Sequence, residues 1–451
     1  MRLIARFAKE AENYFEIITV YDSRVVKEHI NKSTPILVSI VKEYPSAVWF
    51  ERKITDDFGI EILYSHDKRP LVKHENFPKD IFPMRKSFDK IALDRANSVE
   101  EPSTVNHGVI LGPTHPYHLE SSQFQLFDRD KEILHFESMP FYKYRGIEKM
   151  VEGMSLSEAK PIIERISGTS TIAYQLAFLD IQLQASKRVL PSTLKIKHIF
   201  LLELERIINY LSDLAVMCRF IDFIEGFSFF MKLVEEGRES MQLLTGHRFG
   251  FGAIEMDKGL INLEQGYEFV RYLEKELSWF EEWLEEKPSF WKKILEQGFI
   301  KKEEALTFGL VGLVARASGV EIDRRIEDTL YSEYGFVIAQ ESGGDSSSRF
   351  KIRLTEIYTS LRIMRRVLDT KVFPFFLGTY KDGEYYSYKE SSDGELMMYI
   401  ELKDEKIERF FVRDASFLNA QIVSRALKGN ELSSLGLILK SIPLNFSAND
   451  L

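Results

Sequence analysis

Apolar residues in the second half of the chain recur at intervals of three and four. This spacing continues for two to five turns in HIFLLELERIINYLSDLAVMCRF (198–220), GYEFVRYLEKELSWFEEWLEEK (266–287) and RFKIRLTEIYTSLRIMRRVLD (349–369). Because residues at i, i+3, i+4 and i+7 share one face of an α-helix, each run predicts a long helix with one buried side. From about Gly146 onward, the pattern therefore indicates a helix bundle.

Shorter runs on both sides of this region have the composition of β-strands. The runs YFEIITVYD (14–22), PILVSIVKEY (35–44) and AVWFERKI (47–54) are rich in β-branched and aromatic residues, which favours strands. Two strand-like runs in QFQLFDRDKEILHFESMPF (123–141) are joined by the turn-like DRDKE, and GELMMYIELKDEKIERFFVRDAS (394–416) returns to strand character. The pattern predicts an α+β fold, with a small α/β N-terminal domain followed by a helix-bundle domain that has flanking β-strands.

A stretch rich in proline and charge separates these two regions. It covers RPLVKHENFPKDIFPMRKSF (69–88) and continues towards EEPSTVNHGV (100–109), a composition typical of a tail or linker. We therefore expect a first domain at residues 1–85, a linker at 86–104 and a second domain at 105–451.

Composition and charge exclude several classes of protein. The chain has 451 residues, 44% of them hydrophobic and 29% charged, and its net charge of -9 is spread without a basic tract, so nucleic acid is not an expected partner. Its single cysteine, Cys218, excludes an internal disulfide and a metal site of the Cys-x-x-Cys type, and fits a reducing compartment. Charges interrupt each apolar run before the roughly 18 residues that a membrane span needs. The sequence thus predicts a soluble or peripheral chain, and leaves open attachment to a membrane through partner subunits.

A run of small polar residues interrupts an otherwise helical stretch. In ERISGTSTIAYQLAF (164–178), the residues Ser167, Gly168, Thr169 and Ser170 are poor helix formers. The composition alone allows two interpretations: the small side chains permit close helix packing, or they line a site from which something has been removed.

Several motifs resemble a known family and bear on that choice. Two motifs resemble the smaller hydrophilic, 30 kDa-type subunit of respiratory complex I: WFERKITDDFGI (49–60) and RPLVKHENFP (69–78). Four others resemble its larger catalytic-arm, 49 kDa-type subunit, which is homologous to the large subunit of nickel-iron hydrogenases: GPTHP (112–116), YRGIEK (144–149), RASG (316–319) and LTEIYTSL (354–361). The presence of both parts on one chain resembles the large subunit of energy-converting membrane-bound hydrogenases of the formate hydrogenlyase type. The resemblance implies the fold of a hydrogenase large subunit for the second domain.

The resemblance also implies a vacated metal site. In the hydrogenases, two pairs of cysteines hold nickel and iron, and soft thiolates are the ligands that such a centre needs. The first pair corresponds here to Ser167 and Ser170, and the second pair, in an ungapped alignment, to Asn445 and Ala448. Since neutral serine and asparagine oxygens do not replace thiolates, we expect no metal at these positions.

Complex I uses the corresponding cavity to hold a quinone head group between a tyrosine and a histidine. By resemblance, the tyrosine corresponds to Gly168 and the histidine to Leu119, which follows His118. The pair is therefore not reproduced directly. A shift of one residue brings His118 into play, and a tyrosine hydroxyl is available only if Tyr117 or Tyr174 reaches into the cavity.

Five other residues match functional positions of the family. The resemblance implies that Arg145 and Glu148 face the iron-sulfur cluster of a partner subunit, that Glu120 relays protons, and that Arg316 and His115 contribute to the catalytic cavity. Without the resemblance, the arginines are ordinary ion-pair partners, Glu120 is a solvated carboxylate, and His115 is a hydrogen-bonded residue that fixes its loop.

Together these expectations describe a subunit of a membrane-associated respiratory oxidoreductase complex. The chain would bind no cofactor permanently and would accept electrons from an iron-sulfur cluster on a small partner subunit, to reduce a quinone-like or other small acceptor with coupled ion translocation. Expected partners are that small iron-sulfur subunit, ferredoxin-like subunits and the ion-translocating membrane arm, with the chain peripheral at the cytoplasmic face of the membrane. The alternative is a non-catalytic structural or coupling subunit. An open cavity near Ser167, Asn445 and Arg316 would favour catalysis, and a closed apolar one would favour the alternative.

Overall fold

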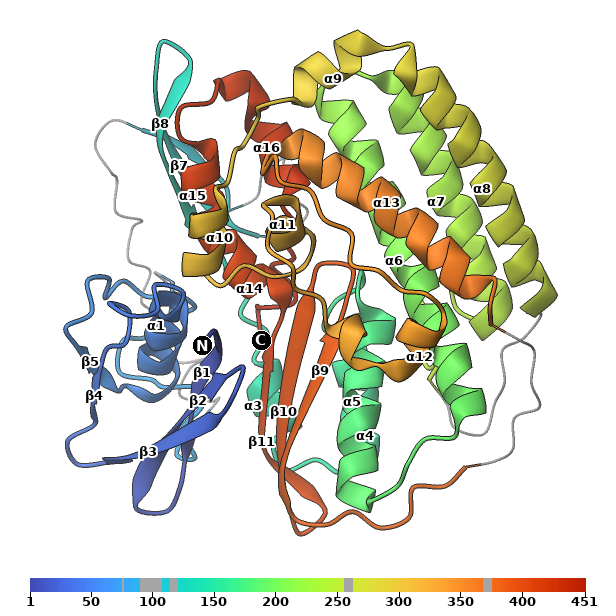
Figure 1. Ribbon diagram of the computed structural model, residues 1–451. Coiled ribbons are helices and arrows are strands. Elements are labelled where there is room, and N and C mark those ends of the chain that lie inside the picture. The colour runs from blue at the N-terminus through green and yellow to red at the C-terminus, as the bar shows by residue number, and fades with distance from the viewer. Residues whose placement is uncertain (75–76, 90–107, 114–120, 255–262, 368–374) are drawn as a thin grey trace.

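The computed structural model describes residues 1–74, 77–89, 108–113, 121–254, 263–367 and 375–451 (Figure 1). A small N-terminal unit, blue in Figure 1, packs beside a larger unit made of two three-stranded sheets and a helix bundle. The predicted α+β fold is thereby confirmed. Among the described residues, no helix combines the length and apolar character needed to cross a membrane.

The N-terminal unit combines two small sheets with one helix. Strands β1 (Leu3–Glu10), β2 (Tyr14–Tyr21) and β3 (Val25–Asn31) form an antiparallel sheet in that order. Strand β4 (Ile36–Val38) pairs in parallel with β5 (Glu61–Leu63). The strand predicted at 14–22 is confirmed, whereas the run 35–44 forms a strand only in β4.

Residues 47–54, predicted as a strand, belong instead to helix α1 (Ala47–Phe58), so that prediction was wrong. Phe50, Ile54 and Phe58 recur every four residues and are all buried, which is the period of a helix. The helix ends at Gly59, whose left-handed φ of 69° lets its N–H donate to the carbonyl of Thr55. The helical period outweighed the β-propensity of the aromatic residues.

Two sheets in the larger unit confirm the remaining strand predictions. Strands β6 (Val109–Leu111), β7 (Gln123–Arg129) and β8 (Glu132–Met139) are antiparallel, and Asp130 and Lys131 form the predicted charged turn with positive φ. Strands β9 (Gly383–Glu390), β10 (Glu395–Lys403) and β11 (Lys406–Arg413) form a second antiparallel sheet. The sequence predicted β10 and β11 but not β9.

The helix bundle contains the three predicted long helices. These are α6 (Ser192–Phe220), α8 (Leu263–Glu285) and α13 (Ser346–Met364). The other helices of the larger unit are α3 (Ile147–Val151), α4 (Leu156–Ile163), α5 (Thr171–Ser186), α7 (Ile224–Thr245), α9 (Pro288–Ile294), α10 (Lys302–Thr307), α11 (Gly312–Ala317), α12 (Thr329–Glu333), α14 (Ala415–Asn419), α15 (Val423–Leu427) and α16 (Leu435–Ser441), with short 3-10 turns η1 (Arg324–Glu327), η2 (Ala420–Ile422) and η3 (Leu432–Ser434). Helix α6 packs against α7, α13 and α16, and α5 packs on the sheet of β9 and β10.

One continuous hydrophobic core joins the two units. The ring of Phe7 in β1 stacks on that of Phe411 in β11 with centroids 4.1 Å apart. Beside them, the Arg413 side chain donates to the carbonyl of Ile4 at 3.0 Å, and Arg2 pairs with Glu395 at 2.6 Å. The N-terminal unit is therefore packed onto the C-terminal sheet. The predicted boundaries at residues 85 and 105 stay predictions, and most of the expected linker lies outside the described residues.

Candidate functional site

The two chain segments that the resemblance paired come together in the structure. We call the resulting site the notch, and define it as Ser167, Gly168, Thr169, Ser170, Asn445 and Ala448. The side-chain nitrogen of Asn445 donates to the hydroxyl of Ser167 at 2.6 Å and to that of Thr169 at 3.0 Å. Its side-chain oxygen accepts from the backbone N–H of Ala448 at 3.3 Å. The loop before α5 is thus hydrogen-bonded directly to the C-terminal segment.

The notch is buried on one side and open on the other. Ser167, Ser170 and Ala448 are buried, whereas Gly168 and Thr169 are exposed. A side chain at Gly168 would begin in open space, because no atom of the described residues outside its immediate chain neighbours lies within 4 Å of its Cβ position. The buried hydroxyl of Ser170 has no hydrogen-bond partner among the described residues. The notch therefore offers neutral oxygen and nitrogen groups next to an opening at Gly168.

A carboxylate from a neighbouring helix fixes the start of α5 beside the notch. Glu205 of α6 accepts hydrogen bonds from the backbone N–H groups of Ile172 at 2.6 Å and Ala173 at 3.2 Å. These groups belong to the first turn of α5, whose N–H groups have no partner within the helix. Ser170 makes no side-chain cap here, so Glu205 takes that place. Burial raises the pKa of Glu205 to about 8, although its two backbone hydrogen bonds act in the opposite direction.

Arg145 connects both segments of the notch. Its guanidinium donates to the carbonyl of Ile166 at 2.8 Å, and also to the carbonyl of Ser447. Ile166 precedes Ser167 and Ser447 precedes Ala448, so the arginine holds the two backbones at a fixed separation. Its expected role towards a partner's iron-sulfur cluster stays a prediction.

Glu148 lies at the junction between the two units. It is fully buried, 2.7 Å from the guanidinium of Arg409 and 3.4 Å from the ammonium of Lys53. Lys53 also pairs with Asp57 at 2.8 Å. These contacts give the carboxylate an ionic role inside the chain, while the expected contact with a partner cluster stays a prediction.

Arg316 belongs to a cluster of buried charges. Its guanidinium pairs with Glu356 at 2.7 Å, Glu390 at 2.8 Å and Asp323 at 3.0 Å. We call this set the charge cluster, which consists of Arg206, Arg316, Arg325, Glu203, Asp323, Glu356 and Glu390, all buried. Burial, together with the nearby charge of Asp323, raises the pKa of Glu390 to about 7.

Asn209 links the charge cluster to the notch. Its side-chain nitrogen donates to the hydroxyl of Ser392 at 2.9 Å and to the carbonyl of Thr169. Ser392 follows Glu390 by two residues, and Arg206 donates to the carbonyl of Glu390 at 2.8 Å. Arg316 is thus coupled to the notch through Glu390 and Asn209 rather than by direct contact.

Sequence reasoning missed the carboxylate behind the notch. Asp414 is fully buried, accepts from the Tyr174 hydroxyl at 3.3 Å, and lies 2.7 Å from the hydroxyl of Ser416. The Ser416 hydroxyl lies 2.9 Å from the carbonyl oxygen of Asn445. Burial raises the pKa of Asp414. Tyr174, which the sequence offered as a source of a hydroxyl in the cavity, therefore directs that hydroxyl to Asp414. The only signal in the sequence for Asp414 was its place as an acidic residue directly after the apolar strand β11.

The remaining predicted residues cannot be placed. Glu120, His115 and His118, together with the nearby Tyr117 and Leu119, lie outside the described residues. Their expected roles in proton relay, catalysis and acceptor binding stay predictions.

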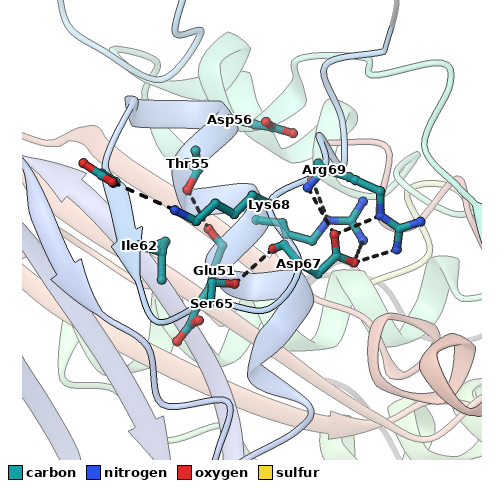
Figure 2. A pocket seen from close by; sticks show the side chains of 10 residues that line it. Glu51, Thr55, Asp56, Ile62, Ser65, Asp67, Lys68 and Arg69 are labelled. Atoms are coloured by element: carbon teal, nitrogen blue, oxygen red, sulfur yellow. Dashed lines mark hydrogen bonds and ion pairs between the residues drawn. The ribbon is translucent and has the colours of Figure 1, made fainter. Parts of the chain in front are cut away.

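In the N-terminal unit, the motif WFERKITDDFGI (49–60) holds the loop after β5 in place, beside the pocket of Figure 2. Asp56 of α1 accepts hydrogen bonds from the backbone N–H groups of Leu71 at 2.6 Å and Val72 at 2.9 Å. Arg52 donates to the carbonyls of Arg69 and Pro70, both at 2.7 Å. Figure 2 shows Asp67 beside the guanidinium of Arg69, with which it pairs at 2.7 Å. The polar side chains of this pocket thus fasten the loop after β5 to α1.

Comparisons with known proteins agree with both parts of the chain. Residues 4–92 match the family described as respiratory-chain NADH dehydrogenase, 30 Kd subunit, and residues 224–374 match the 49 Kd subunit. Formate hydrogenlyase subunit 5 of Escherichia coli (strain K12) is 26% identical, over 94% of this chain and 79% of the relative. Hydrogenase-4 component G of the same organism is also 26% identical, over 94% and 78%.

Two further relatives match about three quarters of the chain. A subunit of the NAD(P)H-quinone oxidoreductase of Prochlorococcus marinus subsp. pastoris (strain CCMP1986 / NIES-2087 / MED4) is 25% identical, over 78% of this chain and 98% of the relative. Among solved structures, a chain of the membrane-bound sulfane sulfur reductase, an archaeal respiratory membrane complex, has a TM-score of 0.71 and 21% identity, covering 76% of this chain and 98% of that one. The similarity to the sulfane sulfur reductase chain, at 21% identity, shows a shared fold.

Proposed function

We infer that this chain is a fusion of the 30 Kd-type and 49 Kd-type subunits of respiratory NADH dehydrogenase, and that it is homologous to hydrogenase subunits. On this premise, we propose that it forms the electron-delivering arm of a membrane-bound oxidoreductase complex. The chain would lie at the cytoplasmic face. It would bind a small iron-sulfur subunit and ferredoxin-like subunits, and through them an ion-translocating membrane arm.

The notch is the proposed place of reduction. Electrons from the partner's iron-sulfur cluster would reach a small acceptor that enters beside Gly168. Two relatives carry names that indicate acceptor classes, a quinone and sulfane sulfur. Both acceptors take up two electrons and two protons, so the site needs hydrogen-bond donors and a proton source. The hydroxyls of Ser167 and Ser170 would hold the acceptor oxygen or sulfur, and Glu120 would supply protons.

The donor set at the notch does not fit a nickel-iron centre. Hydroxyl and amide groups occupy three of the four positions where the hydrogenases have thiolates, and the fourth is Ala448. Soft thiolates are the ligands required for such a centre. We therefore expect no nickel at the notch.

The observation that carries this proposal is the opening at Gly168, beside the hydrogen bond between Ser167 and Asn445. The test uses the native assembly with Gly168→Leu, which fills the opening, and Glu282→Leu as a control at an exposed position of α8. Turnover with a short-chain quinone and with polysulfide would show which acceptor is used. We expect Gly168→Leu to lower turnover about tenfold or more, equivalent to about 1.4 kcal/mol in the barrier, and Glu282→Leu to leave it unchanged.

A second candidate function is a non-catalytic coupling subunit. It is favoured by the internal engagement of Arg145, Glu148 and Arg316, each of which already has partners within the chain. Under that function, Gly168→Leu leaves turnover intact in an assembly of unchanged iron content. Metal analysis of the same preparation tests both candidate functions, because nickel at one atom per chain would contradict each of them.

A further inference from the structure

A groove runs along α5 on the side of its C-terminus, away from the notch. It is a groove of about 560 Å³ between the C-terminal half of α5 and the N-terminal half of α6. The residue of α5 nearest to the notch that lines the groove is Leu176, six residues beyond Ser170, which is about 9 Å along the helix axis. No residue of the notch lines the groove, whereas Arg325 and Glu390 of the charge cluster do. The groove is therefore distinct from the proposed place of reduction, and a ligand in it would bind whether or not the notch reduces an acceptor.

The floor of this groove is apolar. Leu176, Leu179 and Leu183 line it from α5 at intervals of three and four residues, and Ile199 and Leu202 line it from α6. Each of the five is buried, at 9% exposure or less, so their side chains form a continuous wall. A groove of this size and composition is typical of a small-molecule site.

The mouth of the groove is basic. Lys195 is neutralised by Asp328 at 2.9 Å, and Lys389 by Asp180 at 2.5 Å. Lys187 and Arg188, in the turn between α5 and α6, are exposed, and neither forms an ion pair with any described residue. Two cations thus remain available for an anionic group at the entrance.

One polar group lies in the groove without a partner. His198 of α6 lines the cavity at 5% exposure, and its Nδ1 has no hydrogen-bond partner among the described residues. Burial, with a smaller contribution from the charge of Lys389, lowers its pKa to about 4. The imidazole is therefore neutral at physiological pH and offers one donor and one acceptor rather than a charge. An unpaired buried polar atom costs free energy that a ligand could recover.

We propose that this groove binds an anionic amphiphile, with its apolar chain along Leu179 and Leu183 and its carboxylate or phosphate head at Lys187 and Arg188. An uncharged apolar molecule would leave the basic mouth unused. A compact anion without an apolar body would leave the leucine wall exposed.

The test titrates the full-length chain by calorimetry with dodecanoate, dodecyl phosphate and dodecanol, below their micelle concentrations. We expect saturable binding of the two anions at one molecule per chain, about tenfold tighter than dodecanol, a difference of about 1.4 kcal/mol. The double variant Lys187→Gln/Arg188→Gln should bring the anions to the affinity of dodecanol. Lys301→Gln/Lys302→Gln, an exposed adjacent pair at α10, is the matched control and should change nothing. The tighter anion identifies a carboxylate or a phosphate head group.

A second measurement uses the unaltered chain, so that its result does not depend on the folding of the Lys187→Gln/Arg188→Gln variant. Dodecanoate should shift the imidazole resonances of His198 in the unaltered chain, assigned by their absence in His198→Gln. Leu179→Glu, which places a carboxylate in the apolar wall, should abolish binding of all three probes. The proposal is overturned if dodecanoate does not saturate, if dodecanol binds equally well, or if the Lys187→Gln/Arg188→Gln variant keeps full affinity. It is also overturned if the native assembly no longer binds dodecanoate, because a partner subunit then covers the groove.

Discussion

The side-chain nitrogen of Asn445 lies 2.6 Å from the hydroxyl of Ser167, across a separation of 278 residues. Asn445 therefore ties the C-terminal segment directly to the loop that starts α5. The side-chain oxygen of Asn445 accepts from the hydroxyl of Ser447 at 2.9 Å, and the backbone carbonyl oxygen of Asn445 lies 2.9 Å from the hydroxyl of Ser416. Asn445 and its partners thus hold the notch by neutral hydrogen bonds, and the guanidinium of Arg145 adds hydrogen bonds to the carbonyls of Ile166 and Ser447.

Replacing Asn445 by alanine should loosen the C-terminal segment. The change removes hydrogen bonds to Ser167 and Thr169 and leaves the backbone N–H of Ala448 without its acceptor. We expect a loss of about 2–3 kcal/mol in the free energy of local opening, because a buried donor is left unpaired. Hydrogen exchange of residues 443–451 and 166–171 measures it. Asn31→Ala, at the exposed last residue of β3, should leave hydrogen exchange in both segments unchanged. Unchanged protection in Asn445→Ala would contradict the predicted role.

The sequence alone was sufficient for elements whose period is long and regular. The helices predicted at 198–220, 266–287 and 349–369 correspond to α6, α8 and α13, and the hairpin predicted at 123–141 corresponds to β7 and β8, because apolar spacing and turn composition specify these elements. Helix α1 was missed because Trp49 and Phe50 are common in strands, although its buried residues follow the helical period and the helix packs on β1. Local composition cannot resolve such a conflict between period and propensity.

The site was predictable only in part, for a different reason. The meeting of Ser167 with Asn445 followed from the resemblance, since nothing in either segment specifies the other. The charge cluster was beyond sequence reasoning, because Arg316 finds its acids 40 residues away at Glu356 and 74 residues away at Glu390. Buried ion pairs are defined by tertiary proximity, and an arginine in a helical run has the same appearance whether it is solvated or buried.

Replacing Arg316 by methionine should destabilise the chain strongly. Methionine fills the space but leaves the carboxylates of Glu356, Glu390 and Asp323 facing one another with less compensation. Removal of one member of a buried ion cluster costs about 3–5 kcal/mol. Urea unfolding followed by circular dichroism measures the loss. Arg425→Met serves as the comparison, because Arg425 is exposed and pairs with Glu304 at the surface; its cost should stay below about 0.5 kcal/mol. Similar losses for the two variants would refute a cluster-specific effect.

The loop fastened by Asp56 gives a third prediction. Asp56→Ala leaves the backbone N–H groups of Leu71 and Val72 buried without acceptors. We expect a loss of about 2–4 kcal/mol, at about one to two kcal/mol for each unsatisfied donor. Both N–H groups donate to the same oxygen, Oδ2, so Asp56→Asn, whose amide oxygen can take that place at nearly the same size, should recover most of the loss. Thermal unfolding of both variants, read against the unaltered chain, checks this order; an Asn variant as unstable as the Ala variant would show that the charge, rather than the hydrogen bonds, matters.

Glu205 makes the stability of the fold dependent on pH. The pKa of this buried carboxyl is raised to about 8 in the folded chain, above its ordinary value of 4.5. Between pH 4.5 and 8 the unfolded chain has lost this proton while the folded chain keeps it, so the folded state binds more protons and loses stability as the pH rises. One proton corresponds to a slope of about 1.4 kcal/mol per pH unit within that window.

Glu205→Gln should remove this pH dependence, since the amide oxygen can still accept from the N–H of Ile172 and cannot ionise. The stability of Glu205→Gln relative to the unaltered chain should therefore grow from about pH 5 to 8 and then level off. Urea unfolding at one-unit intervals from about pH 5 to 9 measures the difference. Glu282→Gln, at an exposed position of α8, should give a curve parallel to that of the unaltered chain. If the Glu205→Gln curve is parallel as well, the carboxyl does not hold its proton in the folded state, and the start of α5 is capped by a charged group.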